Sequence, residues 1–213
     1  MDTPEFWEDY LAKVPIYNCL INNYSLISDE VLCYKENHDV FVDYPKYEVI
    51  DLETSAEADL YDHYWAVIPL SRFEGEAYDF IEMPGIENFP EFLAARVKHA
   101  REHCPTIVSV ISTLESDNNL ANVFVSRLVP GSVIRPHTGW VDDWMRLHLG
   151  LVCDPDCHIK VGNQQRTWQE GKIIAFKDGG PYPHSVIHNG TKERLILSVD
   201  VKLSYLKTFV NDL

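Results

Sequence analysis

The chain has 213 residues, of which 46% are hydrophobic and 12% aromatic, enough apolar material for one globular domain with a substantial core. Its 33 acidic residues outnumber the 18 basic ones, and the formal charge of -15 repels nucleic-acid phosphates and anionic lipid surfaces. No stretch approaches the roughly 18 apolar residues of a membrane span, and the five cysteines lack a disulfide-framework spacing. We therefore expect a cytoplasmic protein that binds neither nucleic acid nor membrane.

Two helices are predicted in the N-terminal part of the chain. Over residues 3–14, apolar side chains recur on one helical stripe, at Phe6, Trp7, Tyr10, Leu11 and Val14. A second helix is predicted to begin near Pro90 and to be closed by Pro105, with a stripe of Phe89, Phe92, Leu93, Val97 and Ala100. The acidic, tyrosine-rich segment 36–63 is left unassigned, as irregular structure or short strands.

From about residue 121 the chain changes to short β-type runs separated by turn residues. They are ANVFVSRL, PGSVIRPH, MRLHLGLV, CHIKV, GKIIAF, HSVI and ERLILSVDV. Because no helical crossover lies between them, an antiparallel sandwich or barrel is favoured over a parallel sheet. We therefore predict an α+β, mainly β fold as a single domain over residues 1–213, with a helical or mixed N-terminal layer over 1–120 and a β core over 121–203.

Two of these runs alternate in polarity. In MRLHLGLV, Arg146 and His148 face one way, while Met145, Leu147, Leu149 and Leu151 face the other. In ERLILSVDV, Arg194, Ser198 and Asp200 face away from Leu195, Leu197, Val199 and Val201. An arginine inside a barrel is costly unless it meets an anion, so two such arginines suggest a bound dicarboxylate. The alternative is that these faces point to solvent.

The turn sequence at 188–190, His-Asn-Gly, predicts how the last two strands pair. A three-residue hairpin loop with Gly190 in the left-handed conformation puts His184 opposite Arg194, with side-chain carbons roughly 5 Å apart. A two-residue turn instead puts Ser185 opposite Arg194 and turns His184 away. A site that combines His184 with Arg194 therefore requires the odd-length loop or a compensating bulge.

His137 and His184, on different predicted strands, are candidate ligands for iron, which accepts neutral imidazoles and leaves positions open for a chelating cosubstrate. The common iron-binding triad has His-x-Asp or His-x-Glu. Here the motif is His137-Thr138-Gly139, and the next acids, Asp142 and Asp143, lie five and six positions along. Taken singly, each histidine is more often structural than a ligand.

The stretch from Ser126 to Asp200 resembles the aspartyl/asparaginyl β-hydroxylase family of Fe(II)- and 2-oxoglutarate-dependent oxygenases. The resemblance is carried, in order, by SRLVPGSVIRPHTG, MRLHLGLV, RTWQEGKIIAFKD, the histidine of YPHSV, and ERLILSVDV. WAVIPLS at 65–71 and the helix before Pro105 are similar to the family's preceding region more loosely. The family binds iron through two histidines with glycine at the carboxylate position, so the His-Thr-Gly motif agrees with it.

This resemblance implies a double-stranded β-helix, also called a jelly-roll or cupin-like fold, that uses Fe(II), 2-oxoglutarate and O2. It implies that His137 and His184 bind iron and that Ser126 and Arg194 bind the distal carboxylate of 2-oxoglutarate. The further pocket residues it implies, expected to bind 2-oxoglutarate, substrate or both and to act in the reaction, are Arg146 and His148. Asp178 corresponds to an acid near the iron, although the segment GGPYP before His184 is longer here than in relatives.

The substrate is the least defined part of this interpretation. Trp144 stands where we expect a basic residue in the peptide-hydroxylating members, and Trp140 follows the iron motif directly. Those members also carry a large helical substrate-presenting domain with no counterpart in these 213 residues. We therefore expect a small molecule or short peptide as substrate. The acidic residues between 74 and 82 either form a solvated edge or attract a cationic substrate; they are Glu74, Glu76, Asp79 and Glu82.

Three classes of function remain open. The first is a hydroxylase acting on an unactivated C–H bond of an amino acid, an amino-acid derivative or a short-peptide residue. The second is a 2-oxoglutarate-dependent halogenase that uses the vacant carboxylate position for halide. The third is a cupin-like binding protein without catalytic activity.

Overall fold

The structure, a computed structural model, describes residues 4–44, 47–50, 55–71, 88–139 and 141–210. Its helices are α1 (Glu8–Leu11), α2 (Pro15–Asn22), α3 (Tyr24–Asn37), α4 (Phe89–His103), α5 (Pro105–Ser116) and α6 (Leu203–Leu206). Its strands are β1 (Val42–Asp43), β2 (Glu48–Ile50), β3 (Glu57–Asp59), β4 (Tyr61–Asp62), β5 (Trp65–Pro69), β6 (Leu120–Leu128), β7 (Val133–His137), β8 (Trp144–Val152), β9 (Cys157–Val161), β10 (Gln164–Thr167), β11 (Ile173–Lys177), β12 (His184–His188) and β13 (Arg194–Lys202).

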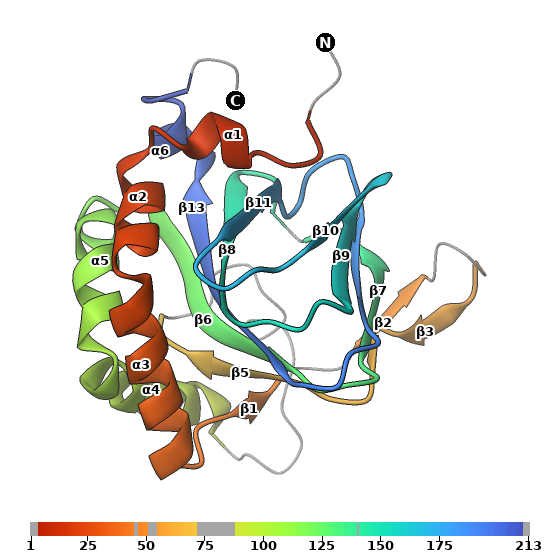
Figure 1. Cartoon of the computed structure of the whole chain (residues 1–213), viewed down its shortest axis with the longest axis horizontal. Helices are drawn as coiled ribbons and strands as arrows, with labels where there is room; N and C mark the ends of the chain where they lie inside the picture. The colour runs from red at the N-terminus through yellow and green to blue at the C-terminus, as the bar shows by residue number, and fades with distance from the viewer. Residues whose placement is uncertain (1–3, 45–46, 51–54, 72–87, 140, 211–213) are drawn as a thin grey trace.

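Two antiparallel sheets face each other. The large sheet has the order β1-β5-β6-β13-β8-β11, and the small sheet has the order β10-β9-β12-β7-β4. From β6 onward the chain passes back and forth between them, with β6, β8, β11 and β13 in the large sheet and β7, β9, β10 and β12 in the small one (Figure 1). This alternation is the double-stranded β-helix, so the predicted fold class is confirmed.

The predicted strands are confirmed in type, and most differ from the structure by only a few residues at their ends. β10 falls between the predicted runs, because its sequence QQRT has little of the alternation that marks a half-buried strand. The unassigned segment 36–63 contains the end of α3 and the short strands β1 to β4. Strands of two or three residues are too short to give a periodic pattern.

The N-terminal part of the chain has more helices than the sequence predicts, and the first of them is shorter than predicted. Helical structure within residues 3–14 is limited to α1, and Tyr10 is 44% exposed, so the predicted apolar stripe is wrong at that residue. α4 ends at His103 as predicted, but Pro105 also begins α5. Proline is well tolerated at the first position of a helix because the N–H it lacks has no intrahelical partner there.

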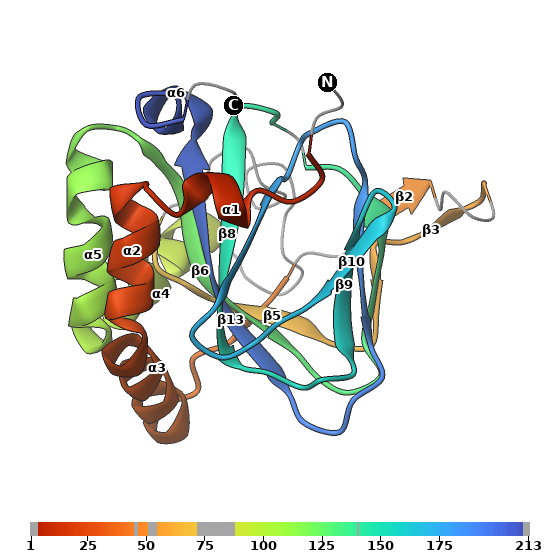
Figure 2. The ribbon, with the colours of Figure 1, turned by 45° about the horizontal axis from the view of Figure 1, so that its top comes forward.

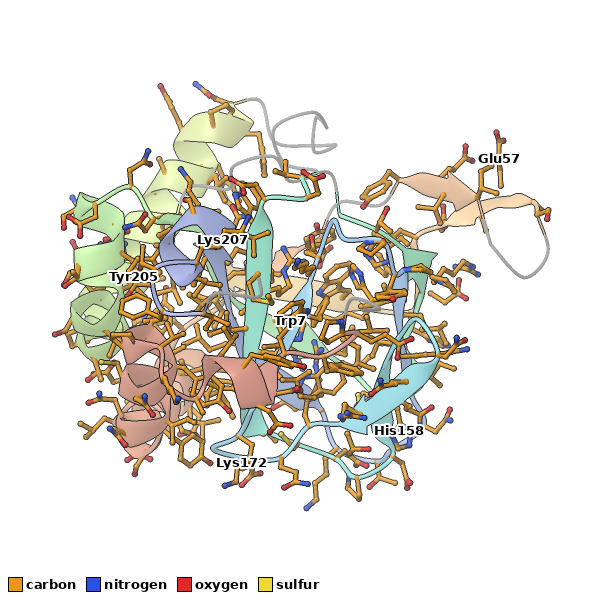
Figure 3. All side chains as sticks on the ribbon, turned by 90° about the horizontal axis from the view of Figure 1, so that it is seen from above. Trp7, Glu57, His158, Lys172, Tyr205 and Lys207 are labelled. Atoms are coloured by element: carbon orange, nitrogen blue, oxygen red, sulfur yellow. The ribbon has the colours of Figure 1, made fainter. Side chains whose placement is uncertain are left out.

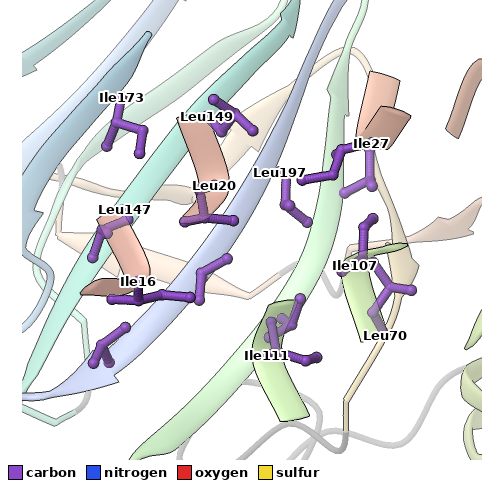
Figure 4. Packing of buried hydrophobic residues seen from close by; sticks show 14 of the residues in the cluster. Ile16, Leu20, Ile27, Leu70, Ile107, Ile111, Leu147, Leu149, Ile173 and Leu197 are labelled. Atoms are coloured by element: carbon purple, nitrogen blue, oxygen red, sulfur yellow. The ribbon is translucent and has the colours of Figure 1, made fainter. Parts of the chain in front are cut away.

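A first hydrophobic core lies between the helices and the outer face of the large sheet. α2, α3 and α5 lie side by side along that face in both views of the ribbon (Figures 1 and 2). Ile16 and Leu20 from α2 lie near Leu147 and Leu149 of β8, whereas Ile111 from α5 lies near Ile107 and Leu70 (Figure 4). A second core fills the space between the sheets.

The polarity alternation in β8 and β13 is confirmed, because the side chains at alternate positions, Met145, Leu147, Leu149, Leu151, Leu195, Leu197, Val199 and Val201, belong to the first core. Arg146, His148 and Arg194 point the other way, into the space between the sheets, and all three are buried. The alternative that these polar faces point to solvent is therefore wrong.

The predicted hairpin at 188–190 is also wrong. β12 pairs with β7 and β9 in the small sheet, whereas β13 belongs to the large sheet, so the connection crosses between sheets. Asp154 directs this crossing, because its carboxylate accepts hydrogen bonds from the N–H groups of Thr191 (2.8 Å) and Lys192 (3.0 Å). Gly190 does not have a positive φ and lies so close to Asp154 that a Cβ would overlap the carboxylate. His184 consequently pairs with His137, and it does not pair with Arg194.

The segment before α1 covers the free edge of the large sheet. The N–H of Trp7 donates to the carbonyl of Ala175 in the edge strand β11, at 2.8 Å. The Trp7 side chain is buried, whereas Glu57 lies on the β2–β3 hairpin that projects from the body (Figure 3). Among the described helices, none has the length and apolarity needed to cross a membrane.

Candidate functional site

All seven site residues predicted from the sequence line one cavity between the two sheets. They are Ser126, His137, Arg146, His148, Asp178, His184 and Arg194. The cavity has about 540 Å³ of space between atoms, part of it open to solvent. The second core surrounds it, so the polar groups in it are largely removed from water.

The two histidines meet because β7 and β12 are neighbours in the small sheet. His137, the last residue of β7, is the register partner of His184, the first residue of β12, and their ring centroids lie 4.2 Å apart. His137 Nδ1 donates to the carbonyl of Arg135 at 2.7 Å, which leaves Nε2 as the basic nitrogen. Burial lowers the pKa of His137 to about 4 and holds the pKa of His184 well below its ordinary value. Both rings are therefore neutral at pH 7, the form in which imidazole binds a metal.

Asp178 occupies the place beside these rings that a side chain at position 139 would need. Its carbonyl accepts a hydrogen bond from the N–H of Gly139 at 2.9 Å, and a Cβ on Gly139 would overlap the Asp178 carboxylate. Asp178 Oδ1 lies 3.3 Å from His184 Nε2 and 2.7 Å from Arg146 Nη1. The acid of the site therefore comes from the end of β11, and the His-Thr-Gly motif leaves room for it.

Arg194 is a buried cation for which the described residues provide no carboxylate. Arg194 is only 2% exposed to solvent. Its Nη2 donates a hydrogen bond to Ser126 Oγ at 2.7 Å. Ser126 Oγ also accepts from Trp65 Nε1 at 3.0 Å, and the guanidinium lies 4.8 Å from the centre of the Trp168 ring. Arg194 Nε has no hydrogen-bond partner among the described groups.

Burial lowers the pKa of Arg194 to about 10, so the side chain is still charged at neutral pH. A charged donor that is buried and not fully bonded is unfavourable unless an anion joins it. The Arg194–Ser126 pair is therefore suited to bind a carboxylate of a ligand.

Arg146 has a different environment, because two protein carboxylates bind it. Its Nε and Nη2 donate to Asp200 at 2.8 and 2.7 Å, and its Nη1 donates to Asp178. Sequence reasoning placed Asp200 on the polar face of the last strand and gave it no role. The contact was not foreseen because it depends on the register between β13 and β8.

His148 faces the same cavity from β8. Burial, with Arg146 and Arg194 nearby, holds its pKa well below the ordinary value, so it is neutral. Its Nδ1 has no hydrogen-bond partner within the described part of the chain, and its ring meets Phe176 edge-on at 5.2 Å between centroids. His148 thus offers a neutral polar group to a ligand.

An aromatic wall completes the cavity, and sequence reasoning missed most of it. Tyr44 stacks on Trp65 with ring centroids 3.7 Å apart, and Tyr47 also lines the space. Both tyrosines come from the unassigned segment. Trp144 is buried on the same side of β8 as Arg146 but is not among the described residues that line the cavity. Trp140 and the acids Glu74, Glu76, Asp79 and Glu82 lie outside the described residues.

The described residues contain no group of three or more histidine, cysteine, aspartate or glutamate side chains arranged to hold a metal ion. The roles assigned to the seven residues from the sequence stay predictions, while their convergence in one cavity is a property of the fold.

Comparison with known proteins gives the family. A family model described as aspartyl/asparaginyl β-hydroxylase matches residues 22–203. The mouse aspartyl/asparaginyl β-hydroxylase is 42% identical over 73 residues, which are 34% of this chain and 10% of that protein. Mouse aspartate β-hydroxylase domain-containing protein 2 is 32% identical over 104 residues, which are 46% of this chain and 30% of that protein.

The chain thus spans about a tenth to a third of the length of these relatives. Among solved structures, the Schizosaccharomyces pombe Cnp3 cupin domain is 9% identical with a TM-score of 0.37, covering 78% of this chain and 93% of that one. The family model extends over most of the chain and includes every residue of the cavity named above. The chain therefore belongs to the aspartyl/asparaginyl β-hydroxylase family.

Proposed function

We propose that this chain is an Fe(II)- and 2-oxoglutarate-dependent dioxygenase that hydroxylates an unactivated C–H bond of a small substrate. The observation that carries the proposal is one cavity with two neutral, adjacent histidines and a buried arginine that lacks a carboxylate partner among the described residues. A metal and a carboxylate ligand would satisfy these groups together. Family membership supports hydroxylation as the reaction.

The residues present fit the iron. His137 already has its Nδ1 bonded to a backbone carbonyl, which orients Nε2 as the ligand atom, and His184 lies against it. Asp178 adds a carboxylate beside His184. Neutral imidazoles with a nearby acid suit a divalent cation, which would offset that negative charge.

The residues also fit 2-oxoglutarate. Arg194 and Ser126 would bind its distal carboxylate, because they form a buried donor pair in the lining of the cavity. Its other end would then lie toward the histidines, with His148 and Arg146 along the same wall. Arginine suits this role since its planar donors match the geometry of a carboxylate.

When bound, iron with 2-oxoglutarate and O2 supplies the oxidation that converts C–H to C–OH, with release of succinate and CO2. The protein's part is to bind and orient the reactants and to exclude water. The aromatic wall of Tyr44, Tyr47 and Trp65 would hold the substrate and shield it. We propose an amino acid, an amino-acid derivative or a short-peptide residue as substrate, and a cytoplasmic location for the enzyme.

The experiment is anaerobic addition of Fe(II) and 2-oxoglutarate, followed by a screen for succinate release over amino acids and short peptides. We expect a visible charge-transfer band that His137→Ala and His184→Ala each abolish. Absence of the band in the unmodified protein would overturn the proposal. Retention of the band in both variants would overturn the ligand assignment.

The halogenase alternative is weaker on structural grounds. It requires halide in the space next to Gly139, and the Asp178 carboxylate already fills that space and would repel an anion. Product mass with and without chloride separates the two reactions. A binding protein without activity would give no succinate in the presence of iron, 2-oxoglutarate and O2.

A further inference from the structure

We propose that Asp200 is a positioning residue of this site, which holds Arg146 in place so that Asp178 stays against His184. The inference rests on the proposed function, in which His184 binds a metal. Asp200 itself is fully buried and is not among the described residues that line the cavity. It would therefore act through its neighbours, without touching a ligand.

The central contact is a two-point ion pair across neighbouring strands. Asp200 on β13 is the register partner of Arg146 on β8, and the two strands are adjacent in the large sheet (Figure 1). Both oxygens of Asp200 accept from Arg146, at 2.8 Å from Nε and 2.7 Å from Nη2. This arrangement fixes the plane of the guanidinium as well as its position.

Asp200 is itself held from the opposite side. Asn122 on β6 is fully buried and donates from Nδ2 to Asp200 Oδ2 at 3.0 Å. The register between β13 and β6 shifts here, from Val199 opposite Val123 to Val201 opposite Leu120, so β6 has an extra residue at this point. Such a bulge re-aims a side chain, and here Asn122 ends beside the aspartate.

Arg146 is connected to His184 through Asp178. Its Nη1 donates to Asp178 Oδ1 at 2.7 Å, and the same oxygen lies 3.3 Å from His184 Nε2. A continuous set of polar contacts therefore crosses the large sheet, from Asn122 through Asp200 and Arg146 to Asp178. Each step comes from a strand next to the last one, or from the end of one.

Stability of the fold alone does not require this arrangement. Buried ion pairs are often replaced by apolar residues of similar volume without loss of stability. The Asp200–Arg146–Asp178 network is buried, and it ends beside His184, which the proposed function makes a metal ligand. A role in placing Asp178 next to that ligand accounts for the network.

In Asp200→Asn one of the two acceptor oxygens becomes an NH2 donor, so Arg146 loses one of its two hydrogen bonds to this side chain, and an Nη2 released in this way is available to Asp178. The guanidinium would then be able to bind Asp178 with two N–H groups and draw the carboxylate away from His184. Asp178 is the acid next to a proposed ligand, and such neighbours typically change metal affinity about 10- to 100-fold. We expect a change at the lower end of this range for Asp200, which acts one residue further away.

The test is Mn(II) binding to the full chain in the presence of 2-oxoglutarate, followed by the electron paramagnetic resonance signal of free Mn(II). In Asp200→Asn we expect the Mn(II) dissociation constant to rise about tenfold. Ser198→Ala is the matched control, because Ser198 is buried on the same face of β13 and its Oγ has no partner among the described groups. Its Mn(II) affinity should stay within about twofold of the unmodified protein.

A second control separates positioning from loss of stability. Ile111→Ala removes a buried side chain of α5 in the first core, so it lowers the melting temperature without touching the network. If Asp200→Asn does not fold, Asn122→Ala removes the Nδ2 donor to Asp200 and should raise the dissociation constant about threefold. The Mn(II) affinity of Ile111→Ala should not change.

The outcomes are distinct. Failure of the unmodified protein to bind Mn(II) with 2-oxoglutarate overturns the proposed function and this inference together. Normal Mn(II) affinity in a folded Asp200→Asn protein, or in Asn122→Ala where that variant replaces it, overturns this inference alone. An equal loss of affinity in Ile111→Ala and Asp200→Asn would show a general effect of stability and would also overturn it.

Discussion

Two buried arginines of the same cavity differ in what balances their charge. Arg146 is bound by Asp178 and Asp200, whereas Arg194 has a serine hydroxyl and an aromatic face but no carboxylate among the described residues. Both have the same donors, so the difference lies in what each is free to bind. An anionic ligand that binds in the cavity should therefore gain most of its electrostatic stabilisation from Arg194.

Replacement of Arg194 by methionine tests this. In the absence of ligand we expect Arg194→Met to melt at the same temperature as the unmodified protein or above it, because a buried cation without a carboxylate partner is removed. The rise in melting temperature that 2-oxoglutarate and Mn(II) give the unmodified protein should be lost. Thermal melts with and without ligands measure both effects.

Arg127→Met is the control for that experiment. Arg127 forms an ion pair with Glu193 at 2.8 Å, is partly exposed, and is not among the described residues that line the cavity. Its replacement therefore removes an arginine but leaves the charges of the cavity unchanged. The response to 2-oxoglutarate should remain. A full ligand response in Arg194→Met would contradict the carboxylate-binding role of Arg194.

At the scale of elements, the crossing from β12 to β13 brings the histidine sheet and the arginine sheet to one cavity. The crossing is set by Asp154, which lies between β8 and β9 and accepts backbone hydrogen bonds from Asp156, Lys192 and Thr191. These bonds lower the pKa of Asp154 to about 2. The site therefore depends on a contact between two connections that lie far apart in the sequence.

This contact predicts a pH dependence of stability. The pKa of Asp154 is lower in the folded chain than its ordinary value of 3.8, so its stabilising contribution is present above about pH 4 and is lost as pH falls toward 2. Asp154→Asn lacks the contribution at every pH. The difference in melting temperature between the two proteins should be constant above about pH 4 and should shrink below it.

Melts between pH 7 and pH 2.5 provide the measurement. Asp156→Asn is the matched control, since Asp156 is an exposed residue of the same connection and its side chain makes none of these bonds. Its difference from the unmodified protein should be small over the whole range. A constant difference for Asp154→Asn down to pH 2.5 would contradict the assignment.

The same elements explain what could be predicted from the sequence. The alternation in β8 and β13 predicted which side chains point inward, because side-chain direction in a strand follows from spacing alone. The turn at 188–190 was misinterpreted because Asp154, more than thirty residues earlier, decides where the chain goes next. Asp200 had no predicted role because its contact with Arg146 depends on strand register. Local sequence patterns therefore predict which face of a strand a side chain occupies. Contacts between distant segments can be identified only from the three-dimensional structure.

At the scale of the whole molecule, the large sheet separates two cores with different tasks. The helices and the outer face of the sheet form an apolar core, whereas the inner face carries the polar groups of the cavity. Because side chains alternate along each strand, mutations on one face leave the other largely in place.

Ile111→Ala tests this separation. Ile111 is fully buried in the helical core, and its truncation should lower the free energy of unfolding by about 2–5 kcal/mol. The affinity for 2-oxoglutarate should stay within about twofold under conditions where the variant is folded. Denaturant unfolding and ligand titration give the two numbers, and a large loss of affinity would mean that the two faces are coupled.

The bond between Trp7 and Ala175 also bears on self-association. β11 lies at one edge of the large sheet. The backbone N–H and C=O groups of an uncovered edge strand can pair with a strand of another molecule. The segment before α1 blocks this edge with a bulky buried ring, over which the amino group of Lys177 lies at 4.7 Å. A chain shortened to begin at Glu8 would therefore keep its cavity residues but expose an edge at which copies could pair and aggregate.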